Sequence, residues 1–278
     1  MRFVKTWMVV ATYCFFSGIV YAEEIIPGHP EFLPERLDYS SYLADPRRAR
    51  FGAGLLVGGG GEHQFDTAIG DDFAFYNLKP GDPPFEKLQI AGSAAVSSRW
   101  DIRHALDQVG SNYRAGLSLS ALHGPWDVRL QYLHESDHLG DELILRTGLT
   151  TRVAYLRQEI DIGVSYFPHA DLRLYAEGSY GFSIGEFNKP WKVQGGVEWE
   201  GGPPLPLGAR LYAASDLQIY QEVHWSPDWT TQVGIVEWRE RHIRSLRIFV
   251  EEHLGHDPLG EFFTERLNYG ELGFAFDF

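Results

Sequence analysis

The sequence has 278 residues but only one cysteine and two methionines, and its 24 Lys and Arg are outnumbered by 38 Asp and Glu. Because Met1, Met8 and Cys14 all lie at the start, no disulfide can stabilise the rest of the chain. The acidic balance argues against nucleic acid as a partner, since phosphate binding requires a basic face. After residue 22, no apolar run approaches the ~18 residues of a membrane-spanning helix.

The first 22 residues have the composition of a secretory signal peptide. Arg2 and Lys5 form a basic start, residues 7–20 are mostly apolar, and residues 20–22 fit the small-residue rule for cleavage. The alternative, an uncleaved membrane anchor, is disfavoured because the apolar run is short. We therefore expect export and cleavage after residue 22. Residues 23–49 contain four prolines and are expected to form an irregular extension without a core of its own.

From residue 50 onward, apolar and polar residues alternate with a period of two, which indicates strands with one apolar face. In residues 126–132, for example, the even positions are Trp, Val, Leu and Tyr, and the odd positions are Asp, Arg and Gln. Residues 207–225 keep one phase throughout and are predicted to form a single long strand. The predicted strands are 50–58, 62–78, 87–99, 112–122, 125–137, 152–166, 170–182, 190–200, 207–225, 228–238, 243–253 and 267–278.

Twelve strands is an even number, and the connections between them alternate in length. Short or proline-rich connections near 79–84, 123–125, 167–169 and 201–204 fall on one side. The longest connections, near 100–111, 137–151 and 254–266, fall on the other side. Outer-membrane barrels have this asymmetry, with short periplasmic turns and longer outer loops.

Two further features favour a membrane barrel over a soluble periplasmic β-protein. The chain ends on an alternating strand closed by Phe278, which resembles the C-terminal signal recognised by the barrel assembly machinery. Trp191 and Trp199 would lie ~27 Å apart along one strand face, near the separation of the two aromatic girdles. We predict an all-β protein, a transmembrane antiparallel barrel of about 12 strands. Its location would be the outer membrane of a Gram-negative-type cell, in contact with membrane lipid and lipopolysaccharide.

The strand faces opposite the apolar ones carry charges of both signs and are expected to line the lumen. The basic residues are Arg99, Arg114, Arg129, Arg157, Arg173, Lys192, Arg210 and Arg247. The acidic residues are Glu135, Glu159, Asp161, Glu177, Glu198, Asp216, Glu222 and Glu251. Such a balance fits either a narrow, weakly selective channel or a cross-linked wall with a purely structural role.

One local cluster has the residue types of a catalytic site. His134 and Ser136 share the parity of the apolar residues of their strand, so both should face lipid near its outer end. This placement resembles the His-x-Ser pair of outer-membrane phospholipase A, and a serine becomes nucleophilic beside a base. The phospholipase pattern continues with Asn-Gly, whereas this chain has Asp137-His138, and no orienting asparagine is evident.

The same cluster also holds oxygen-rich side chains that could suit Ca²⁺. Asp137, His138, Asp141 and Glu142 are close in sequence, and carboxylates are preferred Ca²⁺ ligands. Their spacing is not that of a calcium-binding loop, which favours a solvated acidic loop without a metal. We expect no cofactor, with Ca²⁺ relevant only if the protein is a hydrolase.

Several segments resemble one bacterial family, domain of unknown function 1207. Residues 134–142, with His134, Ser136, His138, Leu139, Gly140, Asp141 and Glu142, are similar to its His-x-Ser-Ser-His-Leu-Gly-Asp-Glu motif, and Asp137 replaces the second serine. Residues 42–47, 213–217 and 260–263 resemble weaker segments of the family. The resemblance implies an exported outer-membrane protein and no established activity.

Two functional hypotheses therefore follow from the sequence. The first is a non-enzymatic outer-membrane barrel that serves as a narrow channel or a structural component of the envelope. The second is an outer-leaflet lipid hydrolase that uses Ser136 and His134.

Overall fold

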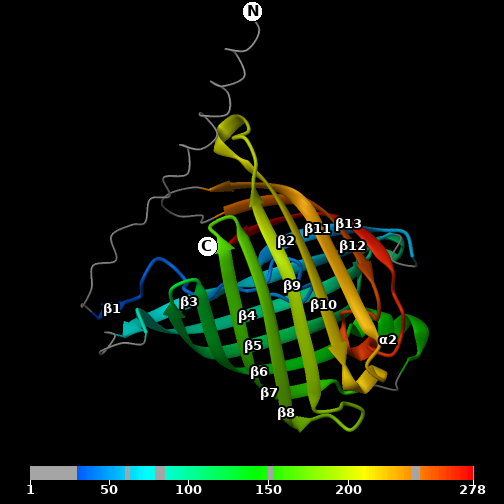
Figure 1. Cartoon of the computed structure of the whole chain (residues 1–278). Coiled ribbons are helices and arrows are strands. Elements are labelled where there is room, and N and C mark those ends of the chain that lie inside the picture. The colour runs from blue at the N-terminus through cyan, green and yellow to red at the C-terminus, as the bar shows by residue number, and fades with distance from the viewer. Residues whose placement is uncertain (1–29, 60–62, 79–84, 150–152, 239–244, 278) are drawn as a thin grey trace, which may run out of the picture.

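The computed structural model describes residues 30–59, 63–78, 85–149, 153–238 and 245–277, which form one closed antiparallel β-barrel (Figure 1). The predicted signal peptide and Phe278 lie outside the described residues. The wall strands are β2 (Phe51–Val57), β3 (Gln64–Leu78), β4 (Lys87–Asp101), β5 (Asp107–His123), β6 (Trp126–Leu139), β7 (Leu156–His169), β8 (Leu172–Ile184), β9 (Trp191–Gly201), β10 (Arg210–Tyr220), β11 (Pro227–Trp238), β12 (Ser245–Leu254) and β13 (Tyr269–Asp277). Each pairs with its sequence neighbours, and β13 pairs with β2 to close the ring.

The helical elements are short. They are the 3-10 turns Ile102–His104, Pro206–Gly208, Gln221–Val223 and Gly260–Phe262, and the helix α2 (Asp141–Thr147). Among the described residues, none of them has the length and hydrophobicity needed to cross a membrane.

The two ends of the barrel differ, as the sequence predicts. One end, here called the turn end, carries the β5–β6 and β7–β8 turns, and the other, the loop end, carries α2 and residues 255–268. The long connections predicted near 137–151 and 254–266 are confirmed at the loop end. The connection predicted near 100–111 is wrong, because β4 and β5 extend toward each other and leave only residues 102–106 between them.

The predicted twelve strands are confirmed, and the clearest error in length is the strand at 207–225. The structure limits β10 to Arg210–Tyr220, with a 3-10 turn on each side. Pro206 begins the first turn, and His224 and Trp225 follow the second with φ angles of 58° and 62°. Left-handed backbone of this kind ends a strand. Val223, in the second of these turns, is still buried. The apolar alternation of the sequence therefore runs past the end of the strand.

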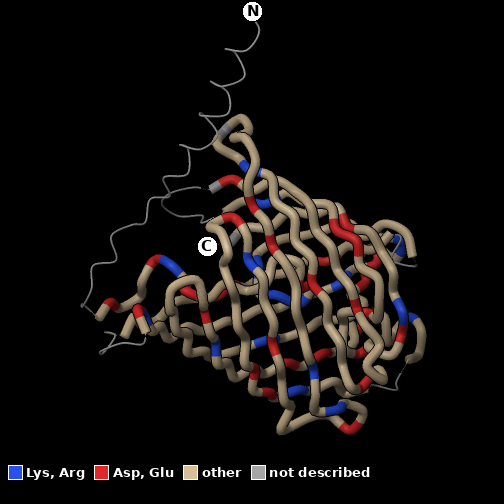
Figure 2. The backbone as a smooth tube through the Cα atoms, in the orientation of Figure 1, with Lys and Arg blue, Asp and Glu red and all other residues tan. Residues whose placement is uncertain are grey.

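The pleat places polar side chains inside and apolar side chains outside. On β6, Arg129, Gln131 and Glu135 are buried in the lumen, whereas Leu130 and Tyr132 are exposed on the outer face. Figure 2 accordingly shows charged residues along the strands and not only in the loops. Trp191 and Trp199 both lie on the outer face of β9, with the apolar residues of that strand. This inside-out pattern is that of a barrel surrounded by lipid.

The first strand of the wall is interrupted. A two-residue strand, β1 (Glu31–Phe32), pairs with Asn77 and Tyr76 near the turn end of β3. Further along the same edge, β2 pairs with β3 from Gly52↔Ala68 to Leu55↔Phe65. Residues 33–50, here called the lumen segment, leave the wall between these two pairings and fold into the barrel (Figure 1). The expected extension is therefore irregular, but it supplies much of the buried core instead of lacking one.

Candidate functional site

The lumen segment is anchored first near the turn end. The N–H of Asp38 donates to Gln89 Oε1 at 2.9 Å, and its carboxylate accepts from Lys87 Nζ at 2.6 Å. Deeper in, Ser41 Oγ donates to Asp72 of β3. These contacts hold the segment against the inner surface of β3 and β4.

Two tyrosines hold the middle of the lumen segment in the barrel. The ring of Tyr42 stacks on that of Tyr175, with centroids 3.8 Å apart and planes 5° from parallel. Its hydroxyl donates to Glu177 at 3.0 Å and contacts the hydroxyl of Tyr39 at 2.8 Å. The guanidinium of Arg129 lies 4.6 Å from the Tyr39 ring centroid, and that of Arg173 lies 5.0 Å from that of Tyr42. Stacking and cation–π contacts of this kind strengthen a buried aromatic cluster.

A tight turn reverses the lumen segment at Asp45. The carboxylate of Asp45 accepts from the N–H of Arg47 at 2.9 Å and from Gln218 Nε2 at 3.0 Å. Burial alone would raise the pKa of Asp45, but the charge of Arg114 and the Arg47 N–H hold it below its usual value. The hydrogen bond from Gln218 ties this turn to β10.

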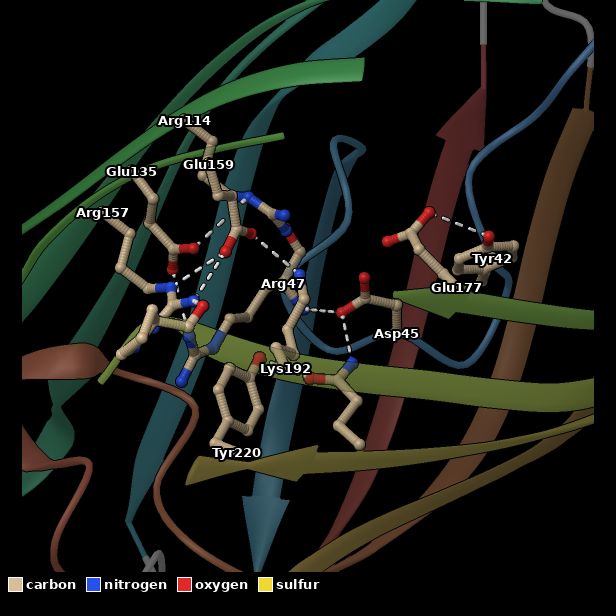
Figure 3. Close-up of polar contacts among 12 residues, drawn as sticks. Tyr42, Asp45, Arg47, Arg114, Glu135, Arg157, Glu159, Glu177, Lys192 and Tyr220 are labelled. Atoms are coloured by element: carbon tan, nitrogen blue, oxygen red, sulfur yellow. Dashed lines mark hydrogen bonds and ion pairs between the residues drawn. The ribbon is translucent and has the colours of Figure 1, made fainter. Parts of the chain in front are cut away.

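Arg47 joins this turn to the loop-end half of the wall (Figure 3). Its guanidinium donates to Glu135 Oε1 and to the hydroxyl of Tyr155, each at 3.2 Å. It also lies 5.2 Å from the ring centroid of Tyr220. Arg114 donates to the carbonyl oxygen of Arg47. The tip of the segment is thus held from β5, β6 and the end of β10.

The wall charges predicted to face the lumen form a buried network. Arg129 pairs with Glu177 at 2.8 Å, and Arg173 pairs with Glu198 at 3.2 Å. Arg157 contacts both Glu159 and Glu222, Lys192 shares Glu159, Asp216 accepts from Tyr175, and Arg247 donates to Gln232. Arg99 binds Asp66 and Asp257, which joins β3 and β4 to the loop before β13. Asp161 and Glu251 are also buried inside the barrel.

Arg210 is the exception. Its side chain is 57% exposed and lies 3.7 Å from Glu200. It is the first residue of β10, it has the same parity as the lumen residues of that strand, and it is opposite Val236 of β11. Arg210 therefore lies outside the buried network, and its contribution to the lumen lining stays a prediction.

Sequence reasoning missed the residues that fill the barrel. Tyr39, Tyr42, Asp45, Arg47 and Arg50 come from the lumen segment, which has no strand periodicity. The family-like stretch at 42–47 was the one available signal. Between this segment and β3–β6 lies a cavity of about 30 Å³, enough for about two water molecules. The lumen segment therefore fills much of the barrel interior that the described residues enclose.

His134 and Ser136 both lie on the outer face of β6, half-buried. Across the strands, Ser136 is opposite Tyr113 of β5, and His134 is opposite Gln158 of β7. Among the described residues, no hydrogen bond joins the side chains of His134 and Ser136. Gln158 places an amide beside the histidine, although its Oε1 accepts from the hydroxyl of Tyr132 at 3.4 Å.

The remaining motif residues diverge, so the proposed Ca²⁺ ligands do not converge. Asp137 is buried in the lumen and accepts hydrogen bonds from Asn112 and from the N–H of Gly260. His138 points outward, edge-on to Tyr113, at 5.5 Å between ring centroids. Leu139 and Gly140 are buried at the end of β6, and Asp141 and Glu142 are exposed in the first turn of α2. The described residues contain no group of three or more potential metal ligands.

The closed barrel, its polar interior and its apolar exterior are those of the class of outer-membrane β-barrels. The chain belongs to the family described as "Protein of unknown function (DUF1207)", which matches residues 12–278. The resemblance inferred from the sequence is thereby confirmed. No curated protein sequence matches this chain.

Two solved structures with a similar fold are outer membrane phospholipases of low sequence identity. An active-site mutant of outer membrane phospholipase A from Escherichia coli has 13% identity and a TM-score of 0.52, over 87% of this chain and 95% of that one. The calcium-bound dimer of the Salmonella typhi phospholipase has 14% identity and a TM-score of 0.50, over 84% and 94%. The NanC porin has 12% identity and a TM-score of 0.47, over 82% and 98%.

Proposed function

We propose that this protein is a gated channel of the outer membrane, closed at rest by its own lumen segment. The observation that carries the proposal is the insertion of residues 33–50 between two parts of one wall strand. Because both ends of the segment are fixed in the wall, it can leave the lumen without leaving the protein. The wall pairs Arg129–Glu177 and Arg173–Glu198 join strand to strand, so a polar path would persist after the segment moves.

The same proposal covers targeting and partners. Residues 1–22 would direct export, and Phe278 would engage the barrel assembly machinery. The apolar outer face would contact outer-membrane lipid and lipopolysaccharide. Membrane fractionation and heat-modifiable migration on a gel test this part. A soluble periplasmic protein that migrates alike with and without boiling would contradict it.

The gating proposal is tested by weakening one docking contact. Wild-type protein in planar bilayers should remain closed for most of a recording. Arg47→Ala removes the charged hydrogen bond to Glu135 but leaves Arg114 beside that carboxylate. A charged hydrogen bond contributes about 1.5–3 kcal/mol, so the ratio of open to closed time should rise by about tenfold to a hundredfold.

The matched control is Arg103→Ala, an exposed arginine in the turn between β4 and β5. It should leave the recordings unchanged. Arg47→Ala recordings indistinguishable from wild type would argue that the segment is a permanent part of the fold, as expected for a structural envelope component.

Lipid hydrolysis is a second candidate function, favoured by the outward placement of His134 and Ser136 beside Gln158. A hydrolase would release fatty acid from phospholipid or lipopolysaccharide in Ca²⁺-containing detergent, and Ser136→Ala would abolish that release without unfolding the barrel. Because no hydrogen bond joins the described histidine and serine side chains, we expect no release from wild type. Release that Ser136→Ala abolishes would instead establish the enzyme.

A further inference from the structure

The outer face carries a group of polar side chains near the loop end of β5, β6 and β7. Its members, here called the outward polar patch, are Tyr113, His134, Ser136, His138 and Gln158. Tyr113 is 43% exposed and His138 is exposed, while the other three are half-buried. None of them takes part in the lumen network, so closure of the channel does not account for them.

The neighbouring strand makes this patch unusual. On β8, the outward residues toward the loop end are Tyr180 and Phe182. Beyond a β-bulge in the pairing with β7, Ser183 is opposite Gln158 and Ile184 is opposite the inward Arg157. Tyr180 and Phe182 are 46% and 54% exposed, as expected of side chains that meet lipid. Tyr132 and Phe182, 6.2 Å apart between ring centroids, mark the border between the apolar surface and the patch. The outer face of β8 is thus aromatic before the bulge and becomes polar only at Ser183, beside Gln158 of the patch.

The aromatic residues also indicate how deep the patch lies in the membrane. Tyr132, Tyr180 and Trp191 are exposed on the outer face, and the rings of Tyr180 and Trp191 meet edge-on at 4.9 Å. Exposed aromatic residues of barrels gather where the hydrocarbon meets the headgroups. His134 and Ser136 follow Tyr132 by two and four residues toward the loop end, ~7 and ~14 Å along the strand. On this geometry the patch would lie in the headgroup layer.

The chemistry of the patch selects among headgroups. The five residues include no Lys, Arg, Asp or Glu, so there is no fixed charge to hold a phosphate. They offer hydroxyl, imidazole and amide groups that both donate and accept hydrogen bonds. An exposed tyrosine ring stands among them, and His134 is opposite the small residue Ala115, which leaves room beside it. Uncharged hydrogen-bonding groups around an aromatic ring suit the hydroxyls and flat faces of a sugar.

We propose that the outward polar patch binds the sugar headgroup of a glycolipid in the membrane leaflet at the loop end. The acyl chains would lie along the apolar outer faces of β6 and β7, where Leu130 and Ile162 are exposed. The patch is then a docking site on the wall, separate from the lumen. The proposal does not depend on gating, and binding requires no hydrolysis.

The test measures lipid retained by the detergent-solubilised full-length protein, using native mass spectrometry. The probes are purified lipid A, which carries a glucosamine disaccharide, and phosphatidylglycerol as an acyl-chain control with phosphate but no sugar. Wild type should bind lipid A at least tenfold more tightly than phosphatidylglycerol. A double variant, His138→Ala with Gln158→Leu, should lose that preference and leaves the candidate pair His134 and Ser136 intact.

Thr231→Ala is the matched control, because Thr231 is a half-buried polar residue on the outer face of β11, outside the patch. It should bind both lipids as wild type does, and heat-modifiable migration should show that every variant is folded. Equal binding of the two lipids by wild type would overturn the proposal. So would an unchanged preference for lipid A in the folded double variant. Neither result would alter the conductance test, so this proposal and the gated channel can fail separately.

Discussion

A variant in which a flexible linker replaces residues 34–49 should conduct ions steadily where wild type is closed. The replacement removes Tyr39, Tyr42, Asp45 and Arg47 from the lumen while retaining β1 and β2. Its design follows from the register, since Leu33 N–H donates to Phe75 and Gly52 is opposite Ala68 on the same edge of β3. A linker that continues along this edge to Arg50 must span ~17 Å, which about eight Gly and Ser residues cover.

Planar-bilayer recording checks this result, and heat-modifiable migration shows whether the barrel has formed. Wild type prepared in the same detergent is the reference. A second variant with an equal Gly-Ser insertion in the exposed turn at His123–Gly124 controls for the linker itself and should remain closed. A folded linker variant that does not conduct would rule out a latent path through the barrel, and with it the gated channel.

The open variant should also prefer cations. The sequence predicts weak selectivity, because its lumen residues include as many bases as acids. The structure adds the inward carboxylates of Asp66, Asp72, Asp137 and Glu271, and it places Arg210 outside the buried network. The linker removes three acids and three bases together, so it leaves this acidic excess of the wall unchanged. Reversal potentials under a salt gradient should therefore shift toward the cation, and a shift toward the anion would contradict this count.

Alternation reveals the wall because lipid and lumen impose opposite preferences on successive residues. In residues 126–132 this contrast is complete, and the predicted strand 125–137 corresponds to β6. The parity of that strand also places His134 and Ser136 on the outer face. Their opposition to Tyr113 and Gln158 depends on the registers of β6 with β5 and β7, which the pattern within one strand does not encode.

The lumen segment could not be predicted for a different physical reason. Its contacts join residues far apart in sequence, such as Arg47 with Glu135 and Tyr42 with Glu177. It has no regular backbone periodicity, so its apolar and polar residues do not repeat at a fixed interval. The four prolines of residues 23–49 favour irregular structure, as observed. An irregular segment inside a barrel and one outside it, however, have the same kind of sequence. The closed lumen follows only from the tertiary structure.

Tyr42→Ala should release the lumen segment more strongly than any other single substitution considered. The change removes a ring stacked 3.8 Å from Tyr175 and the hydroxyl that contacts Glu177 and Tyr39. Truncating a large buried aromatic costs about 3–5 kcal/mol, and each 1.4 kcal/mol is a tenfold change in an equilibrium. The open population should rise by more than about a hundredfold. Tyr42→Phe keeps the ring and loses the hydrogen bonds, at about 1–3 kcal/mol.

Limited trypsin digestion of the membrane-embedded protein measures this opening directly. Cleavage after Arg47 and Arg48, both buried in the closed state, should be slow in wild type, faster in Tyr42→Phe and fastest in Tyr42→Ala. Tyr180→Ala is the control, because it truncates an exposed tyrosine on the outer face and leaves the segment docked. If Tyr42→Ala resists trypsin as wild type does while its barrel remains heat-modifiable, Tyr42 does not hold the lumen closed. The conductance of Tyr42→Ala should follow the same order, since both readouts require the segment to leave Tyr175.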